Sequence, residues 1–144
     1  MPRFFNLLEA ESLLPEVERL LRNLIQAKLD LEASEADLNQ MAQRITLLGG
    51  SVVAREKVIQ IRTRKESATR TLKSIFARIQ EIGCQLKDVE TGLIDFPTLY
   101  RGQEVYLCWK LGEPSITSWH HVADGFAGRR PIDSEFLQNH RGDQ

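Results

Sequence analysis

The amino-acid sequence predicts an α+β protein, in which a long antiparallel coiled-coil hairpin of two helices precedes a small antiparallel β-module. Three observations lead to this fold class. Apolar residues recur at alternating spacings of three and four over residues 17–48 and again over residues 54–82. A Gly49-Gly50-Ser51 turn separates these stretches. After Gly83 the helical spacing gives way to short runs of β-branched and aromatic residues between turn signals.

The first helix is expected to begin near Leu7, because Asn6 and Glu9 have the spacing of a capping box. Pro15 either interrupts this helix or is the first residue of a new one. Beyond it the apolar seam runs without a break to the Gly-Gly turn, and only Ser34 in it is polar. The seam consists of Val17, Leu20, Leu24, Ala27, Leu31, Ser34, Leu38, Met41, Ile45 and Leu48.

The second helix repeats this seam, with Lys65 as its only polar member. It consists of Ala54, Val58, Ile61, Lys65, Ala68, Leu72, Ile75, Ile79 and Ile82. Folding the two arms about the turn brings Ser34 opposite Lys65, and we interpret this polar layer as a register device rather than a ligand site. The predicted organisation is a hairpin over residues 1–83 with its tip at 49–51. A β-module at the hairpin base over 84–132 and a polar, mobile tail over 133–144 follow.

One flank of the hairpin is apolar near its base, where Leu14, Leu21, Ile25 and Phe76 lie. Exposed apolar patches of this kind are rare in monomers, so we expect the β-module or a second copy to cover it. A homodimer with a protein partner bound through the hairpin is therefore expected. The basic stretch over residues 62–73 faces acidic residues of the first helix and contains no interleaved aromatics. Nucleic-acid binding is for that reason not expected.

The overall composition is that of a soluble globular protein. The 144 residues are 42% hydrophobic and 27% charged, with a formal net charge of −1. This balance gives no bias toward nucleic acid or an anionic membrane, and no apolar run approaches the length of a membrane span. Acidic residues within the first twenty positions argue against an export signal, and two cysteines without a framework fit a reducing compartment. We expect a cytoplasmic protein.

Three or four antiparallel strands are expected in the β-module, within CQLKDVE, GLIDF, EVYLCWK and SITSWHHV. The last two of these runs are expected to form a hairpin. In a strand, neighbouring side chains point to opposite faces, so Tyr106 and Cys108 share one face. For the same reason His120 and His121 cannot both point into one site unless a bulge intervenes.

The runs LLPEV, GLIDFP, VYLCWKLGE, WHH and GFAGRRP together resemble a small bacterial family of unknown function, numbered 2203. The resemblance covers nearly the whole chain, and the family brings no activity that could be transferred. It implies that the family's motif positions here are Asp95, Phe96, Pro97, Cys108, Trp109, Gly112, Glu113, Trp119, His120, Gly125 and Arg129. The family's Trp-His pattern points to His120 rather than His121.

Polar residues of the β-module offer a candidate site for a metal ion or a small ligand. The candidate metal ligands are Cys108, His120, Glu113 and Asp95, whose ligand types suit zinc or iron. The sequence has no Cys-x-x-Cys or His-x-x-x-His spacing, which weighs against a closed structural zinc site. Arg129, with Asp95, Glu113 and His120, forms the candidate set for a small ligand. Arg129 could hold an anion or could equally pair with one of the carboxylates.

A nucleophilic role for Cys108, with His120 or His121 as its base, is less favoured. A cysteine in the middle of a strand is more often a small buried apolar residue, and neither a helix N-terminus nor a glycine-rich elbow lies beside it. We therefore assign no catalytic residue. The leading hypothesis is a non-enzymatic, dimeric interaction or scaffold protein without a cofactor. The alternative is a metal- or small-ligand-binding protein that uses a polar pocket in the β-module.

Overall fold

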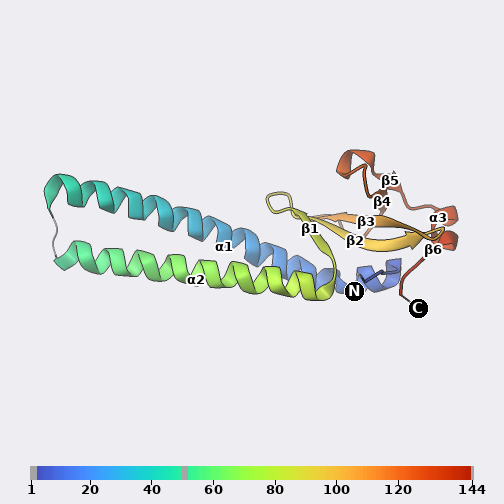
Figure 1. The fold of residues 1–144 in the computed structure, drawn as a ribbon, viewed down its shortest axis with the longest axis horizontal. Coiled ribbons are helices and arrows are strands. Elements are labelled where there is room, and N and C mark those ends of the chain that lie inside the picture. Colours follow the sequence, from blue (N-terminus) through green and yellow to red (C-terminus); the bar gives the residue numbers. More distant parts are fainter. Residues whose placement is uncertain (1–2, 50–51, 144) are drawn as a thin grey trace. The chain divides into compact units, whose positions relative to one another are not determined.

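The computed structural model of the chain describes residues 3–49 and 52–143 and confirms the α+β fold (Figure 1). The helices are α1 (Leu7–Leu48), α2 (Val52–Ile82), α3 (Ser134–Asn139) and the 3-10 helix η1 (Phe126–Gly128). The strands are β1 (Gln85–Asp88), β2 (Leu93–Tyr100), β3 (Gln103–Lys110), β4 (Ser118–His121), β5 (Arg130–Pro131) and β6 (His140–Arg141). The chain divides into two compact units, a hairpin unit of Arg22–Phe76 and a head unit of Met1–Leu21 with Ala77–Gln144.

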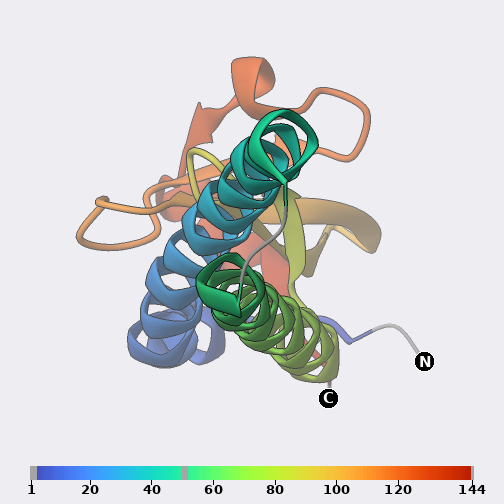
Figure 2. The same ribbon diagram turned by 90° about the vertical axis from the view of Figure 1, so that its left-hand side faces the viewer.

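Within the hairpin unit, α1 and α2 run antiparallel side by side, as the end-on view of Figure 2 also shows. One part of the predicted seam is buried: Leu24, Ala27, Ser34, Ile61, Ala68 and Ile75. Another part is only half-buried: Leu31, Leu38, Met41, Val58, Lys65 and Leu72. The seam is therefore more deeply buried on one side than on the other. Of the predicted tip, Gly49 has a φ of +79°, which favours glycine, and Gly50 and Ser51 lie outside the described residues.

The start of α1 is set by the predicted capping box. The Asn6 side-chain oxygen accepts a hydrogen bond from the Glu9 backbone N–H at 2.8 Å, and the Asn6 N–H donates to the Glu9 carboxylate at 3.2 Å. These two bonds satisfy amides that a helix end otherwise leaves unpaired. The helix begins at Leu7, as predicted.

Both expectations for Pro15 are wrong, because α1 continues through it as one helix of 42 residues. Proline lacks the N–H that would bond to the carbonyl four residues earlier, so one helical hydrogen bond is lost here. Ala10 and Leu14 before the proline and Val17 after it are buried in the head unit. Packing on both sides of Pro15 therefore holds the helix together despite the missing bond. Among the described residues, no helix is both long enough and apolar enough to cross a membrane.

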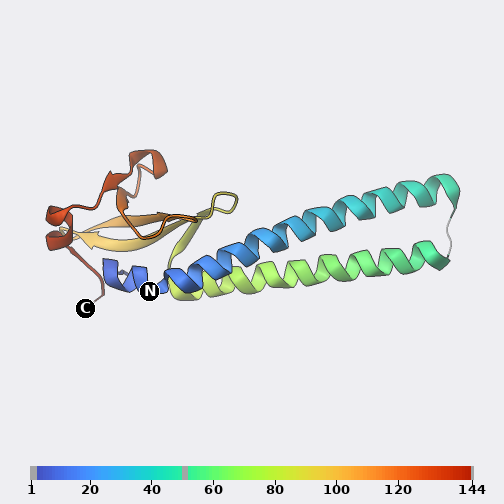
Figure 3. The same cartoon turned by 180° about the vertical axis from the view of Figure 1, so that it is seen from behind.

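The head unit is built on an antiparallel sheet with the strand order β1-β2-β3-β4-β5, and β6 pairs with β2 at its other end. The predicted hairpin of β3 and β4 is confirmed. Phe96, Leu107 and Trp119 lie opposite one another on adjacent strands and form one apolar face. The Phe5 ring packs edge-on against Phe96 at 5.3 Å. In Figures 1 and 3 the first turns of α1 lie on one side of this sheet and η1 on the other.

Residues 134–141 form α3 and β6 instead of part of a mobile tail. Phe136 is fully buried and stacks on Trp119 with ring centroids 4.8 Å apart. The Asp133 carboxylate caps α3 by accepting from the Phe136 N–H at 2.8 Å. One aromatic anchor on the apolar face of the sheet thus orders a segment whose other residues are mostly polar.

Candidate functional site

Three strands bring Asp95, Cys108 and His120 to the same face of the sheet. Asp95 of β2 lies directly opposite Cys108 of β3, and Tyr106 of β3 lies directly opposite His120 of β4. Opposed residues of an antiparallel pair point to the same face, as do residues two apart in one strand. The three side chains therefore share the face opposite to that of Phe96, and this is the face on the η1 side.

Asp95, Cys108 and His120 form a compact buried cluster. One ligand-type atom from each side chain, a carboxylate oxygen, the sulfur and a ring nitrogen, lies within 4.8 Å of the other two. The exposed fractions are 2% for Asp95, 0% for Cys108 and 2% for His120. Buried polar side chains require hydrogen-bond partners, so each of these three side chains influences the hydrogen bonding and protonation of the other two.

A proton lies between His120 and Asp95. The Nδ1 of His120 is 2.7 Å from the His121 carbonyl oxygen, which can only accept, so Nδ1 carries a hydrogen. The Nε2 of the same ring is 3.0 Å from Asp95 Oδ1. A contact this short between two atoms with lone pairs needs one shared hydrogen. The Nε2, the Asp95 carboxylate and the Cys108 sulfur thus converge as donor atoms that a cation could use in place of that proton.

Cys108 is a protonated thiol at neutral pH. Burial, and then the nearby Asp95 carboxylate, raise its pKa from 9.0 to about 12. The thiolate is the reactive and metal-binding form of cysteine, so this thiol is a poor nucleophile as it stands. A stronger positive charge close to the sulfur would be needed to make its thiolate favourable at neutral pH.

Glu113 and Arg129 bind each other rather than joining the three-residue cluster. Arg129 donates from Nη2 to the Glu113 carboxylate at 2.8 Å, and the Lys110 N–H donates to the other carboxylate oxygen at 2.7 Å. The Glu113 backbone carbonyl accepts from the Trp109 ring N–H at 2.9 Å. Their charges nevertheless reach Cys108, where Arg129 lowers the thiol pKa and Glu113 raises it. The pair therefore flanks the cluster.

The comparisons with known proteins agree with the motif strings. A family described as an uncharacterized conserved protein, DUF2203, matches residues 3–132. The chain belongs to this family. The match includes Asp95, Cys108, Glu113, His120 and Arg129 of the DUF2203 chain. No curated protein and no solved structure matches it.

The structure settles which of the two adjacent histidines faces the cluster, and it adds a tyrosine. His120 lies in the cluster, and His121 contacts the Trp119 ring on the other face. Tyr106 packs its ring edge-on against His120, with centroids 5.5 Å apart and an interplanar angle of 71°. Sequence reasoning did not include Tyr106 among the site residues. Its position two residues before Cys108 in the same strand was the signal that could have found it.

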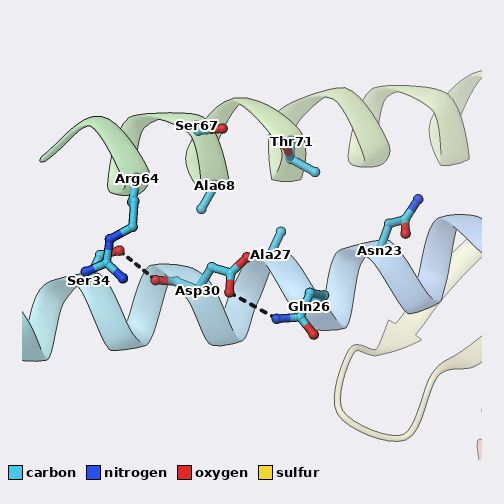
Figure 4. Close-up of a pocket in the computed structure, with 9 residues that line it drawn as sticks. All are labelled: Asn23, Gln26, Ala27, Asp30, Ser34, Arg64, Ser67, Ala68 and Thr71. Carbon is cyan, nitrogen blue, oxygen red and sulfur yellow. Dashed lines mark hydrogen bonds between the residues drawn. The ribbon is translucent and has the colours of Figure 1, made fainter. Parts of the chain in front are cut away.

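A second candidate is a cavity of about 420 Å³ in the hairpin unit (Figure 4). It is lined by short side chains of both helices, among them Ala27, Ser34 and Ala68. The Ser34 hydroxyl donates to the Asp30 carbonyl at 2.8 Å within α1, so the buried hydroxyl is already satisfied. Lys65, its predicted layer partner, instead lines a separate groove. The small residues explain the cavity without a ligand.

Proposed function

We propose that this DUF2203 chain binds a transition metal ion through Cys108, His120 and Asp95, with zinc ahead of iron. The observation that carries the proposal is the convergence of the three ligand-type atoms within 4.8 Å in a buried part of the sheet. Zinc bonds of about 2.0–2.3 Å would hold such atoms roughly 3.3–3.8 Å apart. The atoms that are farthest apart would therefore have to approach each other by up to about 1.0–1.5 Å to complete the coordination.

The donor set favours zinc over iron. One sulfur, one imidazole nitrogen and one carboxylate oxygen are ligands that zinc accepts together. Non-haem iron(II) sites more commonly use two histidines and a carboxylate without a thiolate. Loss of the Cys108 proton and of the proton shared by His120 and Asp95 would accompany binding.

Three protein ligands leave a fourth position to a small molecule from outside the chain. Arg129 supports a negatively charged or oxygen-rich occupant. Its Nε is buried and has no hydrogen-bond partner among the described residues, whereas its Nη2 binds Glu113. Buried donors without partners are rare in folded proteins. Asp95, Glu113, His120 and Arg129 would together form the small-ligand pocket expected from the sequence.

Metal binding can be tested on the full chain after chelator treatment, zinc reloading and desalting. The expected result is one zinc per chain by elemental analysis, and its loss in Cys108→Ser and in His120→Ala. Matched controls are Cys84→Ser and His121→Ala. Cys84 is also buried and has its pKa raised to about 11, and His121 is on the opposite face of the sheet.

Both control variants should keep the zinc of the wild-type chain. Wild-type protein without stoichiometric zinc or iron would refute the proposal. Equal metal loss in the site and control variants would also refute it, because the loss would then follow from unfolding or from binding elsewhere. Far-ultraviolet circular dichroism on every variant separates these last two causes.

We also propose that the chain acts as a non-enzymatic, cytoplasmic interaction protein that forms a homodimer. The hairpin unit favours this second function, because Leu29, Ile59 and Phe76 are 54%, 58% and 46% exposed there. The free thiols Cys84 and Cys108 fit a reducing compartment. Sedimentation velocity on the full chain should report a dimer. A monomer at micromolar concentration would refute this function.

A further inference from the structure

We infer that a second copy of this chain docks on one flank of the hairpin unit, with α1 of each copy lying on α2 of the other in a four-helix bundle whose two hairpins point in the same direction. This inference rests on the proposed interaction function and names its partner and geometry. The flank in question carries a groove of about 620 Å³, lined by Leu38 of α1 and by Arg62, Lys65, Glu66, Thr69 and Arg70 of α2. We call it the basic groove.

The floor of the basic groove belongs to the less deeply buried side of the coiled-coil seam. Leu38 of α1 lines the groove and is only half-buried, although it has a seam position. Leu31 of α1 and Val58 and Leu72 of α2, at further seam positions along the hairpin, are also only half-buried. Phe76 extends the same side of α2 and is exposed. A coiled-coil seam normally buries such residues completely. Two further helices laid into the groove would supply the missing burial.

One rim of the basic groove is positively charged. Arg62, Lys65 and Arg70 make no ion pair among the described residues. From the sequence, acidic residues of the first helix are expected to face the basic stretch over residues 62–73. This expectation holds for Arg64, which pairs with Asp37 at 2.8 Å on the other flank. One glutamate, Glu66, interrupts the positive rim. The rim thus keeps an excess of positive charge without a partner.

The other rim, on α1, is acidic. Glu35 lies between Leu31 and Leu38 on the helix surface, four residues after one and three before the other. Glu32 lies one turn before Glu35, and its contact with Lys28 is a long one of 3.9 Å in an exposed position. A single chain therefore presents an apolar floor between one acidic and one basic rim.

Two-fold symmetry makes this surface complementary to itself. An axis parallel to the hairpin and between two copies puts α1 of one copy over α2 of the other, twice. Glu32 and Glu35 then face the basic rim of the partner, and the apolar floors close on each other. The alternative axis, perpendicular to the hairpin, would put α1 on α1 and acid against acid. The charges therefore favour the arrangement in which the two hairpins point in the same direction.

Charge-reversal variants of the full chain test this arrangement. Glu32→Lys with Glu35→Lys makes both rims basic, and Arg62→Glu with Arg70→Glu makes both rims acidic. Each double variant alone should raise the homodimer dissociation constant by more than about 100-fold in sedimentation experiments at low salt. An equimolar mixture of the two should restore association as a heterodimer. The chain with all four substitutions should again form a homodimer.

The control is Asp37→Lys with Arg64→Glu, which reverses an ion pair on the opposite flank and should leave dimerisation unchanged. Circular dichroism must show wild-type helicity in every variant, and lysine and glutamate are both good helix formers. A wild-type monomer would overturn the interaction function together with this inference. If the wild type is a dimer but the charge-reversal variants leave its dissociation constant unchanged, this docking geometry alone is overturned. The same conclusion follows if the mixture of the two double variants fails to associate.

Discussion

The bond between Asp95 and His120 leads to a quantitative prediction for the metal-free head unit. Both side chains are almost completely buried, and their bond of 3.0 Å is the contact through which the two share a proton. His120→Ala removes one partner and leaves the other buried alone. Breaking a buried pair in this way costs about 3–5 kcal/mol of the free energy of unfolding. This is a large part of the roughly 5–15 kcal/mol that stabilises a typical domain.

Asp95→Asn should cost much less. Because Nδ1 of His120 donates to the His121 carbonyl, a neutral ring accepts at Nε2, and the amide of an asparagine at this position can donate to it. A neutral hydrogen bond then replaces the original one at nearly equal side-chain volume. The expected loss is about 1 kcal/mol. His121→Ala, on the opposite face, is the matched control for the histidine substitution and should also cost about 1 kcal/mol.

Urea unfolding in the presence of chelator measures these differences. Trp109 and Trp119 are buried in β3 and β4, so their fluorescence reports on the head unit. If Asp95→Asn lowers the free energy of unfolding as much as His120→Ala does, the inferred position of the proton is refuted. A His120→Ala cost below about 1 kcal/mol would show that the buried pair contributes nothing. With free zinc at about 100 times its dissociation constant, the wild type should gain about 2.7 kcal/mol, and Asp95→Asn should not.

Three further predictions concern the rest of the head unit. Cys84 and Cys108, with pKa values raised from 9.0 to about 11 and about 12, should resist alkylation in the folded chain at pH 8 and react in denaturant. Thiols of the unfolded chain ionise near pH 9, whereas those of the folded chain ionise only at higher pH. The free energy of unfolding should therefore fall as the pH rises from 9 toward 12. Urea titration should show a shallower fall for Cys108→Ala. Phe136→Ala should lower the free energy of unfolding by about 3–5 kcal/mol, because Phe136 is buried. Leu137→Ala should lower it by less than about 1 kcal/mol, because Leu137 is exposed. Equal losses would contradict the ordered C-terminal segment. Asn6→Ala should lower thermal stability by about 1 kcal/mol, and no change would contradict the capping box.

Local patterns predicted most of the fold. The capping box at Asn6 predicted the start of α1, and the heptad spacing predicted both long helices, because these signals depend on neighbours within two turns. Strand alternation predicted that Tyr106 and Cys108 share a face and that His120 and His121 do not. These features need only the geometry of a helix or a strand.

The sequence did not predict the features that depend on tertiary contacts. Pro15 is a strong local signal for a break, and packing in the head unit overrides it. The short helix α3 has no periodic pattern, and only the position of Phe136 over Trp119 explains its order. Glu113 was grouped with the metal ligands by residue type, but its carboxylate binds Arg129. Nothing in a turn sequence shows which charged neighbour a side chain will reach.

The most direct test of the proposed metal site is the absorption spectrum of the full chain loaded with cobalt(II) in place of zinc. Cobalt bound to Cys108, His120 and Asp95 should give visible bands of four-coordinate geometry and a near-ultraviolet thiolate-to-cobalt charge-transfer band, at one cobalt per chain. The charge-transfer band should vanish in Cys108→Ser and persist in Cys84→Ser. A spectrum no different from that of aqueous cobalt, or a band that disappears only in Cys84→Ser, would contradict the assignment.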